Sequence, residues 1–131
     1  MVRDAITRLN RRLRRTRPMG DLTITQISAL QSLDAAGALT PRELAEVERV
    51  QPPTMTRIIA KLEARDLVQR TPHPTDGRQV ILAPSAAGRE LIEAYRRARD
   101  EWLAQRIARL SVEERDTLQR AAEILFRLAG D

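Results

Sequence analysis

The segment from Thr40 to Gly88 concentrates short polar and basic side chains of the kind that contact nucleic acid. A helix predicted over Pro52–Arg65 has apolar side chains along one face and threonine, arginine and lysine side chains along the other. Threonine reaches phosphates and base edges, arginine makes a two-pronged contact to guanine, and glutamine is suited to adenine. We therefore predict a DNA-contacting face made of Gln51, Pro53, Thr54, Thr56, Arg57 and Lys61.

The chemistry of each side chain suggests its role in this face. Arg57 is the candidate for guanine and Gln51 for adenine, whereas Lys61, one turn after Arg57, is expected to meet phosphate. Unpaired backbone N–H groups at the start of the helix are expected to add a second phosphate site.

A basic hairpin follows the helix. Two short strands, predicted over 67–70 and 79–82, flank a loop that contains Asp76-Gly77, a strong hairpin-turn signal. Arg78 is predicted to enter a minor groove, and Asp76 to hold Arg78 or a neighbouring backbone N–H. Arg70, at the base of the hairpin, is interpreted as a phosphate contact. A groove-sized helix followed by a basic hairpin predicts a winged helix-turn-helix whose partner is double-stranded DNA.

Two other interpretations of the same residues stay open. Exposed basic residues on a helix, such as Arg57 and Lys61, are often only solvated. The second hypothesis is a nonspecific nucleic-acid-binding or architectural protein that uses its arginines on a helical scaffold. A winged helix used only for protein–protein contact is the third hypothesis. The threonine-rich face of the helix favours sequence-specific binding.

The other elements are predicted from helix caps and apolar spacing. Thr23 with Gln26, Thr40 with Glu43, and Ser111 with Glu114 each form a capping box, and Ser85 caps a long helix over 86–110. A first helix spans 2–15, a loop covers Met19–Asp21, and Gly37 ends the second helix. The side chains expected to pack inward are Ile27, Leu30, Leu33, Leu44, Val47, Met55, Ile58, Ile59 and Leu62. The last helix carries an apolar stripe of Leu118, Ala121, Leu125 and Leu128.

Composition narrows the class of protein. The length of 131 residues fits one domain. Hydrophobic residues make up 42% of the chain and aromatic residues only 2%, which suits helical packing.

The excess positive charge is concentrated at the N-terminus. Residues 1–20 hold seven arginines and one aspartate, whereas the net charge of the whole chain is +5. Arg11, Arg12, Arg14 and Arg15 are therefore expected either to contact phosphates, or to pair with Glu113, Glu114 and Glu123 of a second subunit, or to be solvated. A transit peptide is the less favoured interpretation, because Val2, Ile6, Leu9 and Leu13 form a packing stripe.

The inventory of side chains argues against an enzyme. The chain has no cysteine, its one histidine, His73, lies in a predicted loop beside Pro74, and no serine is paired with a histidine and a carboxylate. We therefore expect no catalytic residue, metal site or cofactor, and no apolar run is long enough to span a membrane. The lack of cysteine fits a reducing interior, so we expect a cytoplasmic, nucleoid-associated bacterial or archaeal protein.

The segments TPRELAEVERVQPPTMTRIIAKLEARDLVQR and DGRQVILAPSAAG resemble the MarR family of multiple antibiotic resistance regulators. The positions of the family's wing signature are occupied by Asp76, Arg78, Ile81, Leu82, Ser85 and Gly88. Where the family commonly has glycine before the recognition helix, this chain has Glu48-Arg49. The resemblance covers essentially the whole chain.

This resemblance implies a mainly α fold with a small β-hairpin wing (α+β), as one domain over 1–131. Helices in 1–18 and 86–131 would form a homodimer, and 22–85 would be the winged-helix lobe that binds DNA. Independently, the apolar stripes of the first and last helices have little to pack against in so small a chain. A twofold dimer would bind a near-palindromic operator, most simply as a repressor. Many family members bind small aromatic ligands; Tyr95 and Trp102 are interpreted as packing residues, and no effector site is assigned.

Overall fold

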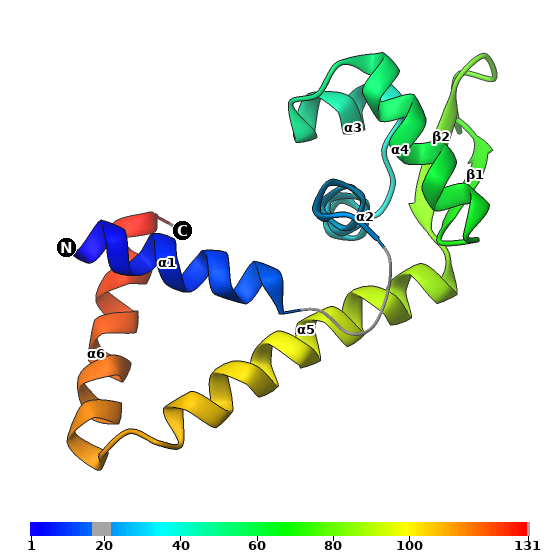
Figure 1. Cartoon of the computed structure of the whole chain (residues 1–131). Coiled ribbons are helices and arrows are strands. Elements are labelled where there is room, and N and C mark those ends of the chain that lie inside the picture. Colours follow the sequence, from blue (N-terminus) through cyan, green and yellow to red (C-terminus); the bar gives the residue numbers. More distant parts are fainter. Residues whose placement is uncertain (17–21, 131) are drawn as a thin grey trace. The chain divides into compact units, whose positions relative to one another are not determined.

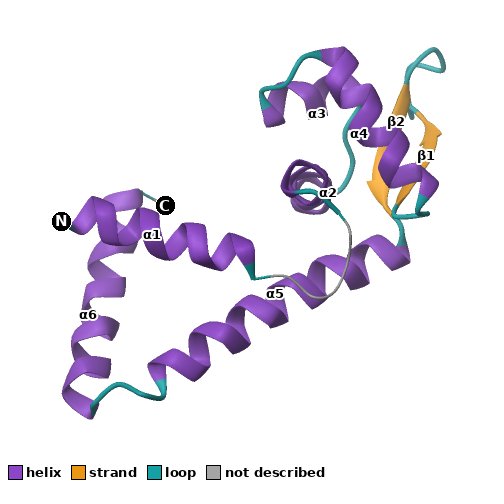
Figure 2. Ribbon diagram, viewed as in Figure 1, coloured by secondary structure: helices purple, strands orange, loops and turns teal. Residues whose placement is uncertain are grey.

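The computed structural model describes residues 1–16 and 22–130, so the expected loop at Met19–Asp21 lies outside the described residues. The described part is mostly helical with one two-stranded antiparallel hairpin (Figures 1 and 2), which confirms the predicted fold class. Its elements, in chain order, are α1 (Val2–Arg15), α2 (Ile24–Ala36), α3 (Pro41–Glu48), α4 (Pro52–Ala64), β1 (Val68–Pro72), β2 (Val80–Pro84), α5 (Ala86–Ile107) and α6 (Val112–Ala129).

The chain divides into two compact units. The core unit is residues 17–97, and the terminal unit is residues 1–16 together with 98–131. Helix α5 contributes its first part, up to Arg97, to the core unit and the rest to the terminal unit. The assignment of DNA binding to one part of the chain and dimerisation to another stays a prediction.

All three predicted capping boxes are present. Thr23, Thr40 and Ser111 each accept a hydrogen bond from the backbone N–H three residues on, and Gln26, Glu43 and Glu114 each accept one back. In α3 the backbone N–H of Thr40 donates to Glu43, and this bond lowers the pKa of the Glu43 carboxyl. These boxes are local in sequence, so the starts of α2, α3 and α6 are fixed by residues that lie next to them.

The hydrophobic core lies entirely in the core unit. Helix α2 packs against α3, α4 and β2, and α4 packs against β1. The predicted inward side chains of α2 and α4 are buried, and Leu30, Leu33 and Leu62 have no exposed surface. Leu39 extends the hairpin by an isolated bridge to Leu82, with N–O distances of 3.0 and 2.7 Å.

The prediction for Val47 is wrong. Its side chain is 56% exposed, and Leu44 and Ala45 are the buried residues of α3. The helix has only eight residues and ends in a left-handed turn at Arg49, with φ 56° and ψ 45°. Val47 lies two residues after Ala45, about 200° around the helix, so it points away from the face that Leu44 and Ala45 bury. Arg49 takes a left-handed backbone conformation, which glycine adopts with less strain than arginine.

The hairpin and α5 differ from their predicted bounds by a few residues. The strands run from Val68 to Pro72 and from Val80 to Pro84, and α5 ends at Ile107 instead of 110. The loop between the strands is closed by hydrogen bonds from the His73 N–H to the Gln79 carbonyl and from the Gln79 N–H to the Asp76 carbonyl. Because β1 ends at Pro72 and β2 begins at Val80, the loop is longer than the two-residue turn that Asp-Gly often makes, and Gly77 does not take a positive φ.

Candidate nucleic-acid interface

Helix α4 has one buried and one exposed face. Met55, Ile58, Ile59 and Leu62 are buried on the first. Gln51, Pro53, Thr56, Arg57 and Lys61 are exposed, as predicted, and Thr54 is half-buried. Among the described residues, Arg57 and Lys61 have no ion pair, so both cations are free to meet an anion.

The start of α4 offers fewer backbone N–H groups to a phosphate than the predicted phosphate site requires. Gln51 is the N-cap and Pro52 and Pro53 are the first two helical residues, so two of the first three positions have no N–H to donate. Thr54 keeps the third. The Thr56 hydroxyl donates to the Pro52 carbonyl at 3.0 Å, which leaves its lone pairs as acceptors toward solvent.

In the wing, Asp76 holds Arg78 in the way the sequence predicts. One carboxylate oxygen accepts the Arg78 backbone N–H at 3.1 Å and its Nε at 3.3 Å, and the other accepts the Gln79 side-chain amide at 3.1 Å. The Arg78 backbone bond, followed by the Arg78 side-chain bond, lowers the pKa of Asp76. The Arg78 side chain remains 92% exposed, and its two terminal nitrogens have no partner among the described residues.

Arg70 forms an ion pair with a carboxylate that the sequence did not predict as its partner. Its Nη2 lies 2.6 Å from Oε1 of Glu63 on α4, and this bond raises the pKa of Arg70. The pair ties the base of the hairpin to the end of α4. A phosphate contact by Arg70 would have to compete with Glu63, so its predicted role is weaker than that of Arg78. No sequence spacing signals the pair, because the two residues meet only after the chain reverses at Asp66, which has φ 56°.

Comparison with known proteins places this geometry in a family. The MarR family model matches residues 22–80, from the residue before α2's cap to the start of β2. A helix-turn-helix transcriptional regulator of Mycobacterium bovis is 49% identical over 97% of this chain and 89% of its own length. The multiple antibiotic resistance protein MarR of Salmonella typhimurium is 31% identical over 76% of this chain and 69% of its own length. The chain belongs to the MarR family.

A solved structure agrees with the family. The multiple antibiotic resistance repressor MarR superposes with a TM-score of 0.75 at 25% identity, covering 95% of this chain and 91% of the other. These relatives are transcriptional regulators and not enzymes. The described part of the chain also contains no group of three or more acidic or histidine side chains able to hold a metal ion.

The last two positions of the MarR wing signature join the hairpin to α5. The Ser85 hydroxyl donates to the Asp66 carbonyl at 2.6 Å and accepts the Gly88 N–H at 3.0 Å. A Cβ on Gly88 would overlap the Leu67 carbonyl oxygen, so only glycine lets α5 lie this close to the start of β1. These residues fix the base of the wing and do not themselves face solvent.

The terminal unit contains the N-terminal arginines of α1 and the Trp102 side chain of α5. The guanidinium of Arg106 lies 3.8 Å, and that of Arg12 5.5 Å, from the centroid of the Trp102 ring. Both faces of an aromatic ring attract cations, so this indole is already engaged, as expected of a packing residue. Arg11, Arg14 and Arg15 are exposed. Within residues 1–16 and 22–130 no helix is long and apolar enough to cross a membrane.

Proposed function

We propose that this MarR-family transcriptional regulator binds a near-palindromic DNA operator as a homodimer and represses transcription there. Helix α4 would lie in a major groove, and Arg78 would reach an adjacent minor groove. The observation that carries the proposal is that one lobe presents two exposed basic elements, the outer face of α4 and the 92% exposed Arg78 on a loop braced by Asp76. Gln51, Pro53, Thr54 and Thr56 would complete the contacts of α4, and Arg70 and Asp76 would support those of the wing.

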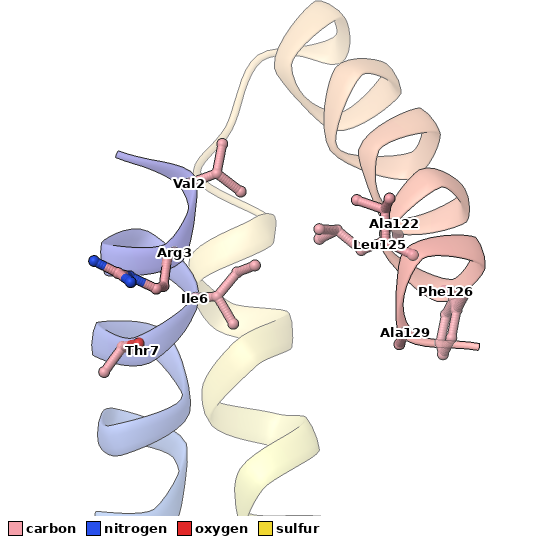
Figure 3. Close-up of a pocket in the computed structure, with 9 residues that line it drawn as sticks. Val2, Arg3, Ile6, Thr7, Ala122, Leu125, Phe126 and Ala129 are labelled. Atoms are coloured by element: carbon pink, nitrogen blue, oxygen red, sulfur yellow. The ribbon is translucent and has the colours of Figure 1, made fainter. Parts of the chain in front are cut away.

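The terminal unit supports a homodimer. None of the residues of α1 and α6 is buried, although both helices carry large apolar side chains. Val2 and Ile6 on α1 and Ala122 and Leu125 on α6 point into a shared groove of ≈ 690 Å³, which Phe126 and Leu128 also line (Figure 3). Apolar surface of this extent is normally covered by a partner. A second copy of the chain, related by a twofold axis, would cover both helices and set two recognition helices on half-sites roughly 34 Å apart.

Repression, release by a small ligand and action in the cytoplasm are proposed from membership of the MarR family. We propose repression because the matched MarR structure is that of a repressor. Release by a small aromatic ligand stays a proposal without a site, since Trp102 is already engaged by two arginines. Action in the cytoplasm, at the nucleoid, is proposed because relatives of this chain are DNA-level regulators.

The second candidate is a nonspecific nucleic-acid binder, favoured by the arginine-rich α1. The test is a titration of the purified protein against DNA from upstream of its own gene, with random duplex as competitor at two salt concentrations. A specific repressor prefers its operator by at least about 10³-fold. If no operator emerges there, selection from a random DNA pool separates an operator located elsewhere from the absence of sequence preference. Equal binding of every duplex, lost steeply with salt, would contradict the proposal.

A further inference from the structure

His73, the only histidine of the chain, lies at the start of the wing loop and is half-buried. Its ring nitrogen Nδ1 accepts the backbone N–H of Thr75 at 3.2 Å and that of Asp76 at 3.1 Å. The Thr75 hydroxyl lies 3.3 Å from the same nitrogen. An imidazole nitrogen accepts a hydrogen bond only when it carries no proton, so this loop conformation requires Nδ1 to be unprotonated.

These bonds connect His73 to Arg78 through Asp76. His73 fixes the Asp76 backbone, and the Asp76 carboxylate in turn fixes the Arg78 backbone and its Nε. The imidazole is thus the inner member of the hydrogen-bond chain that ends at the exposed guanidinium. Two carboxylates are near enough to interact with the charge on His73: Asp76 in the loop itself and Glu43 at the start of α3.

We propose that His73, with Nδ1 unprotonated, is a positioning residue that holds the wing loop in the shape that presents Arg78 to DNA. When the imidazole takes up a proton from solvent on the Nδ1 lone pair, the N–H groups of Thr75 and Asp76 lose their acceptor. The loop then relaxes and Arg78 is no longer braced. This inference rests on the proposed function, because it assumes that Arg78 contacts DNA.

The proposal predicts that DNA affinity falls as pH falls, which is opposite to the change expected from added positive charge alone. A protonated His73 would add positive charge beside the DNA, and that alone would strengthen binding as pH falls. Loss of the positioned loop would weaken operator binding instead. This chain has only one histidine, so a variant at position 73 separates a pH dependence that arises at this ring from one that arises elsewhere.

The experiment measures operator affinity from pH 5.5 to 8 for the unmodified protein and three variants. His73→Asn places an amide oxygen where Nδ1 lies, so it accepts the same bonds without titrating. His73→Gln places its amide nearer the position of Nε2, and His73→Ala has no acceptor. We expect the affinity of the unmodified protein to fall about tenfold as pH falls. His73→Asn should stay tight and insensitive to pH, and the other two variants should be weak throughout. Unchanged or stronger binding at low pH, or tight binding by His73→Ala, would overturn the proposal.

A second measurement keeps this inference separate from the proposed function. In the protein without DNA, the amide NMR signals of Thr75 and Asp76 should shift with the protonation of His73, and in His73→Asn they should not. If those signals shift but no DNA sequence is preferred, the inferred loop switch stands and the proposed operator binding fails. If the signals of Thr75 and Asp76 do not respond to His73 protonation while the operator is bound tightly, the inference fails and the proposed function stands.

Discussion

The two units of this chain are stabilised in different ways. Among its described residues, the core unit buries sixteen hydrophobic side chains, which come from α2, α3, α4, the hairpin, the first half of α5 and the residues just before α2 and β1. The terminal unit has α1 and α6, in which no residue is buried, and leaves Phe126 and Leu128 75% and 77% exposed. One unit completes its core within a single chain, whereas the other presents apolar surface that a second chain would cover. The residues predicted to contact DNA lie on the unit whose own packing holds them in place.

The largest expected effect is a loss of folding stability, which we compare for a leucine-to-alanine substitution in each unit. Leu30→Ala in the core should lower the free energy of unfolding by about 2–5 kcal/mol, because a fully buried leucine leaves a cavity. Leu118→Ala on α6 removes a side chain that is 42% exposed in one chain. Urea unfolding at several protein concentrations should show a smaller loss for Leu118→Ala that depends on concentration. Equal losses at every concentration would remove the distinction between the units.

Self-association should depend on the groove of the terminal unit. Leu125→Asp puts a charge among apolar residues of α1 and α6, and desolvating it should weaken the dimer by about 2 kcal/mol or more. Gln119→Asp, at an exposed polar position of the same helix, is the matched control and should leave the dimer intact. Light scattering after size-exclusion chromatography measures both. A Leu125→Asp variant that elutes like the unmodified protein would show that this groove is not the dimer surface.

DNA affinity should depend on the core unit instead. Arg78→Ala and Arg57→Ala should each cost about 1–3 kcal/mol of operator binding, while leaving self-association unchanged. Arg96→Ala is the control, since Arg96 pairs with Glu93 on α5 at 2.8 Å and is not predicted to meet DNA. Fluorescence anisotropy with a labelled operator gives the three affinities. If Arg78→Ala and Arg57→Ala bind like the Arg96 control, the recognition surface is misplaced.

The smallest expected effect is a pH dependence shared by the two units. Backbone hydrogen bonds from Thr40 and Ser111 hold the pKa values of Glu43 and Glu114 below the ordinary 4.5. Because the folded-state values are the lower ones, the stabilisation is complete above pH 4.5 and is lost as pH falls through the folded-state pKa. Glu43→Gln and Glu114→Gln should each flatten the acid side of the stability curve, measured by thermal unfolding from pH 3 to 6. A curve as steep as that of the unmodified protein would mean that these caps do not contribute.

The sequence predicts the local features of this fold well. Capping boxes such as Thr40 with Glu43, and the buried stripe of α4, depend on residues within one or two turns, so spacing is enough to find them. The burial of Val47 was predicted wrongly, because Leu44 and Ala45 form the buried face of α3 and Val47 lies on the other side of the helix. The pairing of Glu63 with Arg70 depends on how the chain reverses at Asp66, which no periodicity encodes. The bonds to the His73 ring are local, but histidine is not one of the residues whose side chains usually signal a turn. The bracing of Arg78 by Asp76 was predictable because the two residues share one turn.

The most direct test of this account is the mass of the complex that the unmodified protein forms with its operator, measured by sedimentation equilibrium. The account predicts two chains, each of 14.9 kDa, on one near-palindromic duplex, with the core units on the DNA and the terminal units joining the chains. One chain per duplex at saturation, with no self-association of the free protein, would contradict it.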